Sequence, residues 1–430
     1  MAQASACGFC SWHGEPPQAE VCVTEDIWHT ESVFRIHRRA QVISVIALIL
    51  LLALDARLQS ASSQKTEPPE KSQKLPRPIP LGRGVTLERD SASGELRATK
   101  DASPPGPDRA IRARVTLVQV PCTVTAPDGT QVRGLRQGDF HLFEDGVAQE
   151  IASFDASATP ASVALVIDAS PSIFHELAEM RAAARSLAEN LSPADEIGVV
   201  SFSAEAHVLL PFSKNRSLLE HAIESQYLAK VENSSESRIY ESVFLAAREL
   251  FQGRTGRKAM VLLTDGQDSG LGLTWDPRSA QPSTGAAASR LVFDDVAREL
   301  GADGIALFIV STENRPRGMT PEWLETHRGE MLVSAEARKQ NMPNYTLYLA
   351  ELARRAGGPI YFLREIGNLG EIYRRIAVAI SAQYTLGFYP AAGTAKPGWR
   401  SLRVELAPGA ETPTGSKLIY RGSYYVSAFQ

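Results

Sequence analysis

An unbroken apolar run at residues 163–167 ends directly in the polar sequence D-A-S-P-S at 168–172. A continuous apolar stretch of this length predicts a strand buried on both faces, as in a parallel sheet covered by helices. Open α/β sheets bind their ligands just beyond the carboxyl ends of such strands. One carboxylate and two hydroxyls at alternate positions there form an oxygen-only set, which suits Mg²⁺, Mn²⁺ or Ca²⁺ better than zinc or copper. The same residue types also cap helices, so this motif alone leaves both interpretations open.

Two further loops are expected to bring oxygen atoms to the same edge of the sheet. The apolar run 259–263 leads to Asp265 and a turn glycine, and a hydroxyl-rich loop at 234–237 leads into a helix. Three loops that each deliver hydroxyl or carboxylate groups are hard to explain as helix caps alone. Asp268, which follows in the third loop, is expected to be an exposed turn carboxylate, and the alternative is a residue that supports the metal ligands from behind.

Strand and helix patterns alternate along the middle of the chain. Strands are predicted at 163–167, 197–202, 259–263, 304–310 and 360–363, with an edge hairpin strand at 206–210. Helices are predicted at 173–191, 218–226, 239–251, 292–300, 347–356 and 369–380. This alternation predicts an α/β fold with a doubly wound, mostly parallel sheet.

Four sequences carry a family resemblance: VALVIDASPS, DEIGVVSFS, SESRIYE and MVLLTDGQD occur in this order between residues 163 and 268. Over about residues 160–385 the chain resembles the von Willebrand factor type A (VWFA) family, which has a Rossmann-like fold. The resemblance implies a metal-ion-dependent adhesion site. In such a site Ser170 and Ser172 would coordinate a cation directly, Asp168 and Asp265 would act mainly through bound water, and Ser237 would supply one more hydroxyl.

The Ser237 assignment departs from the family pattern, because the family usually has threonine at the aligned position. A serine hydroxyl can ligate equally well, and Ser234 or Ser235 could take the role instead.

The flanking segments also resemble a known group. Residues 115–154, with the signature GDFHLFEDG, and the ending YTLGFYP…RGSYYV are similar to a family of exported bacterial VWFA-related proteins found especially in acidobacteria. Both flanks are strand-like, with turn signals at 128–129, 145–146 and 408–409. We expect them to pair into a small accessory β-unit.

The N-terminal region has a different composition. Arginines precede the apolar run 42–54, and small residues follow at 60–62. This layout predicts a secretory signal peptide, and the alternative is an uncleaved membrane anchor at 42–58. Either one predicts an exported, periplasmic, cell-envelope or extracellular protein. The expected organisation is an N-terminal extension at 1–62, a disordered linker at 63–110, an accessory β segment at 111–158, the VWFA domain at 159–383 and a C-terminal β segment at 384–430.

Two long interruptions of the α/β pattern, at 269–290 and 312–345, are predicted to leave the sheet on the side of the metal site. Loops of such length are usually functional or disordered. Trp275 and Trp323 are candidate partner contacts, and packing onto the domain is the alternative for each.

Enzyme and nucleic-acid functions find little support. A net charge of −4 with scattered basic residues gives no general attraction to nucleic acid. The turn after the first strand lacks the glycines of a phosphate-binding loop, and neither H-E-x-x-H nor G-x-S-x-G occurs. Cys122, in an alternating strand, is expected to be a buried structural thiol.

The sequence therefore predicts a non-enzymatic, exported module. We expect it to bind a protein partner that presents an Asp or Glu carboxylate, through a site loaded with Mg²⁺, or with Mn²⁺ or Ca²⁺. A metal-independent structural scaffold is the second hypothesis, and a metal-assisted hydrolase or an enzyme-associated subunit is the third.

Overall fold

The structure is a computed structural model of the whole chain. It describes residues 77–91, 94–100, 117–156, 159–169, 177–223, 236–270, 273–276, 281–284, 291–316, 319–320, 344–390 and 397–426. All of these fall within one compact unit, residues 74–430. The predicted signal peptide or anchor lies outside them, as do Ser170 and Ser172. Within the described ranges, no helix has both the length and the apolar character needed to cross a membrane.

A seven-stranded sheet forms the centre of the α/β part. Its spatial order is β1 (Ile79–Pro80), β10 (Ala206–Ser213), β9 (Glu196–Phe202), β8 (Ala161–Asp168), β11 (Arg257–Thr264), β14 (Ile305–Ser311) and β15 (Ile360–Phe362). The five strands from β9 to β15 are parallel, β10 pairs antiparallel with β9, and β1 pairs antiparallel with β10. Every residue of β8 and β14 is buried, because helices cover both faces.

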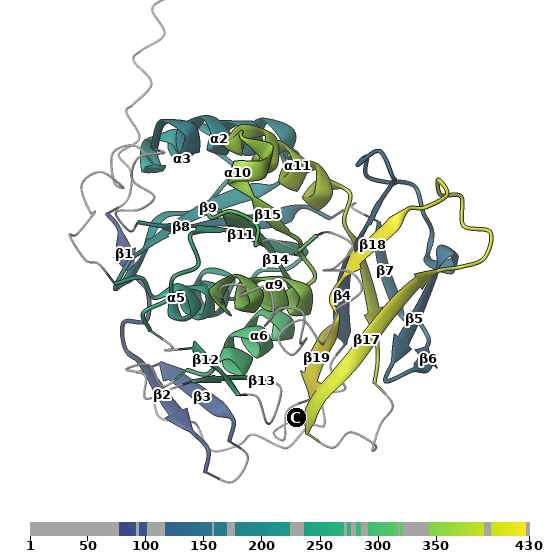
Figure 1. Cartoon of the computed structure of the whole chain (residues 1–430), viewed down its shortest axis with the longest axis horizontal. Helices are drawn as coiled ribbons and strands as arrows, with labels where there is room; N and C mark the ends of the chain where they lie inside the picture. The colour runs from purple at the N-terminus through teal and green to yellow at the C-terminus, as the bar shows by residue number, and fades with distance from the viewer. Residues whose placement is uncertain are drawn as a thin grey trace, which may run out of the picture. The chain divides into compact units, whose positions relative to one another are not determined.

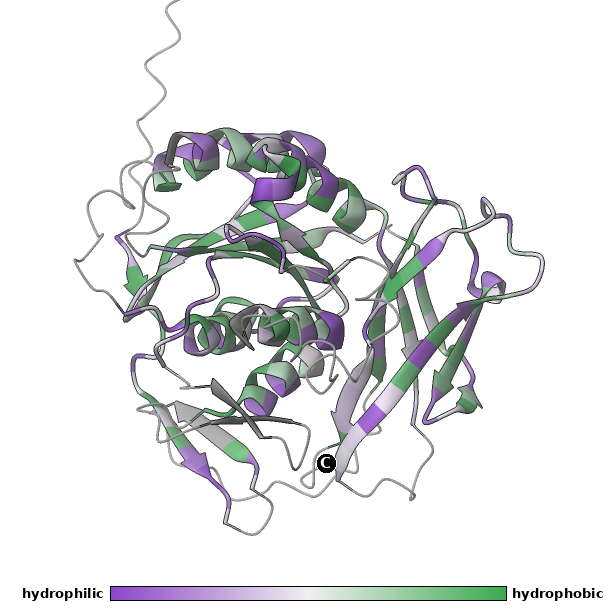
Figure 2. Ribbon diagram, in the orientation of Figure 1, coloured by the Kyte–Doolittle hydropathy of each residue, from purple (hydrophilic) through white to green (hydrophobic). Residues whose placement is uncertain are grey.

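Helices lie on both faces of this sheet (Figure 1). One face carries α2 (Leu177–Asn190), α3 (Ser217–His221), α10 (Leu363–Ile366) and α11 (Leu369–Ser381). The other carries α5 (Ile239–Leu245), its π-helical continuation η4 (Ala246–Leu250), α6 (Phe293–Ala302) and α9 (Asn344–Ala356). Alternate residues of β8 serve the two cores: Val163 and Leu165 pack toward α2 and α11, and Ala164 and Val166 toward α5 and α6. The apolar colouring of the strands in Figure 2 follows this arrangement.

The predicted doubly wound, mostly parallel sheet is confirmed, and each predicted strand of the α/β part falls on an observed one. One difference concerns the strand predicted to form an edge hairpin. Residues Ile79 and Pro80 pair with Val208 and His207 of β10, so β10 has a neighbour on both sides. Proline suits the outer position, because it has no amide hydrogen to donate to a further strand.

A hairpin occupies part of the segment that was expected to be a disordered linker. It consists of β2 (Val85–Arg89) and β3 (Leu96–Lys100). Leu87 and Leu96 pack against the core beneath α5 and α6, and Arg89 forms a 2.7 Å ion pair with the buried carboxylate of Asp295. The polar composition of 63–110 gives no local signal for this hairpin. The hairpin is stabilised by its contacts with the α/β core, which the local sequence pattern does not reveal.

The two flanks of the α/β part pair with each other, as the predicted accessory β-unit requires. The first flank supplies β4 (Val118–Thr125), the short helix η1 (Gln137–Asp139), β5 (Phe140–Glu144), β6 (Val147–Gln149) and β7 (Ser153–Ala156). The second flank supplies β16 (Tyr384–Phe388), β17 (Gly398–Leu406), β18 (Lys417–Tyr420) and β19 (Ser423–Val426). They form two antiparallel sheets, ordered β18-β4-β16-β7 and β19-β17-β5-β6, around a shared apolar core.

Cys122 lies in that core, fully buried, as the sequence predicts. The predicted turn at 145–146 joins β5 to β6 directly, since Glu144 pairs with Val147. Asp145 and Gly146 have φ values of 46° and 82°, the left-handed conformation that a two-residue hairpin turn needs.

Arg421 lies where the β-unit meets the α/β part: its side chain joins strands of the β-unit, and its backbone contacts Gly357 of the α/β part. Its guanidinium donates to the carbonyls of Gln119 (3.0 Å) and Ser423 (2.9 Å), and its backbone amide lies against Gly357. A Cβ at Gly357 would come within 2.8 Å of that amide, so only glycine fits. Burial lowers the pKa of Arg421 to about 10.

The first long interruption contains a second small hairpin, β12 (Leu273–Asp276) paired with β13 (Gln281–Thr284). Trp275 pairs through its backbone with Pro282. Its side chain lies outside the described residues, as do Trp323 and most of the second interruption, so the two predicted partner contacts stay predictions.

Candidate metal centre

The carboxyl ends of β8 and β11 lie side by side. Ile167 pairs with Leu263, so Asp168 and Thr264 are the next residues in register. From β8 the chain crosses one face of the sheet through α2, whereas it enters β11 from the opposite face through α5 and η4. The sheet therefore has its topological switch point between these two strands, which is where open α/β sheets bind ligands.

Asp168 is the most deeply buried of the three predicted site residues that the structure describes, with no exposed surface. Its Oδ2 accepts a hydrogen bond from Ser237 Oγ at 3.1 Å and another from Thr264 Oγ1 at 2.8 Å. A carboxylate buried to this extent needs such donors, because burial removes the hydrogen bonds that water would otherwise make to it. Both donors are neutral, so they satisfy the oxygen without cancelling its charge.

Asp265 begins the loop after β11 and is 6% exposed. Its Oδ1 accepts from the amide of Gln267 at 2.9 Å, which closes a local turn. Gly266 has a φ of 89°, a conformation that side-chain-bearing residues rarely adopt. The glycine in the T-D-G sequence therefore lets the chain turn sharply immediately after the carboxylate.

The loop that carries Ser237 is fastened to the loop that follows Asp265. The amide of Ser237 donates to Ser269 Oγ at 3.2 Å, and the amide of Ser269 donates to the carbonyl of Ser237 at 2.7 Å. Ser237 is 4% exposed. These reciprocal contacts fix the backbone of Ser237 while its hydroxyl points to Asp168.

Asp268 makes a second connection between the same two loops. Its Oδ1 lies 3.4 Å from the amide of Tyr240 in the first turn of α5, and its Oδ2 accepts from the amide of Gly270 at 2.9 Å. The side chain of Arg238, the residue before α5, does not cap the helix. Asp268, 28 positions after Tyr240, instead accepts from one of the free amides of the first turn. Burial, reinforced by the Asp268 charge, raises the pKa of the Tyr240 hydroxyl.

Of the two expectations for Asp268, these contacts correct the first, the exposed turn carboxylate. It is half-buried and joins two loops, rather than being an exposed turn carboxylate. A local reading of the turn misses this role, because the partner of Asp268 belongs to a distant helix.

The structure brings three of the five predicted site residues to one edge of the sheet: Asp168, Ser237 and Asp265. Ser170 and Ser172 lie outside the described residues, as do the alternative hydroxyls Ser234 and Ser235. Thr264 was not among the predicted residues, although its contact with Asp168 is the shorter of the two described. The sequence gives little indication of this role for Thr264, because threonine is a common residue at the end of a strand.

The chemistry of this edge is that of neutral hydroxyls and carboxylates. In the part of the chain that the structure describes, no three His, Cys, Asp or Glu side chains gather into a metal-binding group. Oxygen ligands of this kind fit a hard cation such as Mg²⁺, Mn²⁺ or Ca²⁺, and they fit zinc or copper less well. The residues present are thus compatible with the expected ion.

Comparison with known proteins gives a family match in the same region. The family model of the von Willebrand factor type A domain matches residues 162–320, from β8 to just beyond β14. No curated protein matches the sequence.

Solved structures similar to this chain include three from different sources. An aerotolerance-related membrane protein from Bacteroides fragilis, bearing multiple mutations to serines, has 16% identity, a TM-score of 0.35 and coverage of 51% of this chain and 98% of its own. A von Willebrand factor type A protein from Catenulispora acidiphila has 12% identity, a TM-score of 0.35 and coverage of 72% and 74%. Proximal thread matrix protein 1 from the mussel byssus, with a zinc-occupied MIDAS motif, has 14% identity, a TM-score of 0.34 and coverage of 55% and 48%.

Proposed function

We propose that the chain is an exported cell-envelope module that binds protein partners through a divalent-cation-dependent adhesion site. The match of residues 162–320 to the family model of the von Willebrand factor type A domain supports this proposal. The site consists of Asp168, Ser170, Ser172, Ser237 and Asp265. Binding, rather than catalysis, is the proposed activity.

The hydrogen bond from Ser237 Oγ to Asp168 Oδ2 is the observation that carries this proposal. It joins two residues 69 positions apart at the switch point of the sheet, inside the family-matched region. Since the Ser237 proton is directed to the carboxylate, the lone pairs of the hydroxyl oxygen face elsewhere and can serve a cation. Asp265, at the end of the neighbouring strand, adds a second carboxylate to the same edge.

The proposed roles follow from the chemistry of the side chains. The hydroxyls of Ser170, Ser172 and Ser237 would ligate the ion, and Asp168 and Asp265 would hold its water ligands. A hard cation held by neutral hydroxyls supplies an electrophilic open position that attracts an external carboxylate. The partner is therefore a protein that presents Asp or Glu.

Export and the choice of partner class rest on the sequence. The apolar run 42–54 behind arginines supports a signal peptide or an anchor at 42–58. The net charge of −4 supports a protein partner over nucleic acid.

The decisive experiment is a calorimetric titration of the full-length protein with Mg²⁺ and Mn²⁺, with acetate present as a stand-in for the partner's carboxylate. Asp168→Ala removes the buried acceptor of the site. Asp303→Ala is the matched control, because this carboxylate pairs with Lys258 (3.7 Å) before β14, at the opposite edge of the sheet. Saturable binding in the wild type and the control, lost in Asp168→Ala, supports the proposal. Absence of binding in the wild type at millimolar metal overturns it.

A metal-independent envelope scaffold is the second candidate. It is favoured by the serine at 237, where the family usually has threonine, and by the two hydroxyl donors that already satisfy Asp168 Oδ2. The same titration separates the two, because a metal-independent scaffold shows no saturable metal binding. A metal-assisted hydrolase or an enzyme-associated subunit is the weakest candidate, and a screen for metal-dependent hydrolysis addresses it.

A further inference from the structure

Thr264 is the last residue of β11, and its side chain is fully buried. Two contacts define its position. Oγ1 donates to Asp168 Oδ2 at 2.8 Å, and the same oxygen accepts from the amide of Gly266 at 3.0 Å. A hydroxyl has one proton, so the direction of both bonds is determined: the carboxylate takes the proton and the amide takes a lone pair.

The Thr264 hydroxyl links the side chain of Asp168, at the end of β8, to the backbone of the turn after β11. Asp168 is the last residue of β8, and Gly266 lies in the sharp turn directly after Asp265. A rotation of Asp168 would break the bond to Thr264, and a shift of the turn would break the bond to Gly266. The two carboxylates of the site are therefore held in one arrangement through a residue that belongs to neither loop.

A second constraint on the site geometry arises because two hydroxyls donate to the same oxygen of Asp168. Thr264 and Ser237 both donate to Asp168 Oδ2, from different elements. While Thr264 holds that oxygen in place, the Ser237 proton has a fixed target and the Ser237 lone pairs keep a fixed direction. The β-branched side chain of threonine supports this, because its χ1 rotation is more restricted than that of serine.

We propose that Thr264 is a positioning residue of the metal centre: it does not ligate the cation, but it presets the orientation of Asp168 and Ser237 and the turn at Asp265. This inference rests on the proposed metal-dependent function. The prediction is that metal affinity depends on the Thr264 hydroxyl although the hydroxyl is outside the ligand set. Partners of this kind typically change metal affinity by about 10- to 100-fold when removed.

The neighbouring strand provides a matched control. Ser311 ends β14, pairs in register with Thr264, is 1% exposed and accepts the amide of Glu313 at 3.3 Å. Its hydroxyl thus makes the same kind of turn contact, two residues onward, as Thr264 makes with Gly266. Ser311→Ala removes a buried turn hydroxyl at the same edge, and Thr264→Val removes one that also bonds Asp168.

The test compares Mn²⁺ and Mg²⁺ dissociation constants of the full-length wild type, Thr264→Val, Thr264→Ser and Ser311→Ala by calorimetry with acetate present, and their melting temperatures in EDTA. Thr264→Val is expected to weaken metal binding by about 10- to 100-fold. Thr264→Ser restores the hydroxyl and is expected to recover most of the affinity. Ser311→Ala is expected to bind like the wild type.

Three outcomes decide the inference. Equal affinity of Thr264→Val and wild type overturns it and leaves the proposed function standing. An equal loss in Ser311→Ala also overturns it, because the effect is then a general one of the sheet edge. Lack of metal binding in the wild type overturns the proposed function itself and the inference with it.

A further variant covers the case in which Thr264→Val does not fold. Thr264→Cys keeps a side chain of similar size, but a thiol is a much weaker donor than a hydroxyl. Its affinity is expected to fall well below that of Thr264→Ser, and equal affinities of these two variants overturn the inference.

Discussion

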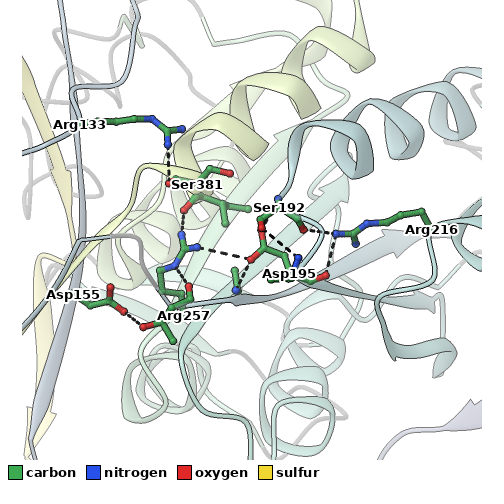
Figure 3. A network of polar contacts seen from close by, with 11 residues as sticks. Arg133, Asp155, Ser192, Asp195, Arg216, Arg257 and Ser381 are labelled. Atoms are coloured by element: carbon green, nitrogen blue, oxygen red, sulfur yellow. Dashed lines mark hydrogen bonds and ion pairs between the residues drawn. The ribbon is translucent and has the colours of Figure 1, made fainter.

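Arg257 and Asp195 form an ion pair at the amino edge of the central sheet, with 3.9 Å between Nη2 and Oδ1 and side-chain exposures of 4% and 1% (Figure 3). Arg257 is the first residue of β11, and Asp195 precedes β9. Asp195 also accepts the amides of Ala161 (2.7 Å) and Ser192 (2.9 Å). Burial lowers the pKa of Arg257, and the charge of Asp195 opposes that shift. The pair therefore holds three parallel strands together at the edge opposite the candidate metal site.

Asp195→Ala is expected to lower the free energy of unfolding by about 3–5 kcal/mol, because it leaves the Arg257 charge buried without its partner. Urea denaturation measures the change. Glu220→Ala serves as the control, since Glu220 pairs with Arg185 at 2.6 Å on the surface, where solvent screens the interaction. A loss in Glu220→Ala as large as that in Asp195→Ala would contradict the assigned importance of burial.

Glu371 gives the stability of α11 a defined pH dependence. Hydrogen bonds from Arg374 and Arg375 lower the pKa of Glu371 from its usual 4.5 to about 2. The ionised form is favoured by folding, so the contribution is complete above pH 4.5 and disappears as the pH falls toward 2. Glu371→Gln is expected to lower the unfolding free energy by no more than about 1 kcal/mol at pH 7, because solvent screens the carboxylate. Urea unfolding at several pH values should show the difference shrinking below pH 4.5, and a difference independent of pH would exclude this origin.

The thiol of Cys122 is expected to be inert in the folded protein. Burial raises its pKa to about 12, so the reactive thiolate is scarce at neutral pH. In a variant with Cys7, Cys10 and Cys22 replaced by serine, alkylation of Cys122 should occur only as the protein unfolds in urea. Rapid labelling without denaturant would show that the core of the β-unit opens readily.

Single alanine substitutions should identify the hydroxyl of the second loop. Ser237→Ala removes the donor to Asp168 Oδ2, and we expect metal affinity to fall by about tenfold or more. Ser234→Ala and Ser235→Ala should bind metal like the wild type in the same titration. If one of these two loses affinity and Ser237→Ala does not, the resemblance-based assignment of Ser237 is wrong.

Much of the α/β part could be predicted from the sequence, because strands buried on both faces leave a strong local signal. The apolar runs ending at Ile167 and Leu263 identified β8 and β11, and the polar residues that follow identified the edge where the candidate site lies. The Asp145-Gly146 turn could also be predicted, since few residue pairs adopt two successive positive φ angles.

The contacts that complete the site could not be predicted in this way. Thr264 and Ser269 act through partners that only the folded sheet brings near, and nothing in their immediate sequence distinguishes them from ordinary turn residues. The hairpin that contains Leu87 could not be predicted either. The sequence around it is polar, and Leu87 is partly buried by contact with the α/β core.

The pairing of the flanks also sets an order of events. β4 lies between β16 and β18, and both of these strands come after the whole α/β domain in the chain. During synthesis, both backbone edges of β4 therefore stay unpaired until residues 384–420 have been made. Open strand edges invite pairing with other chains. A product cut short after the α/β domain would therefore expose β4 with both of its backbone edges unpaired.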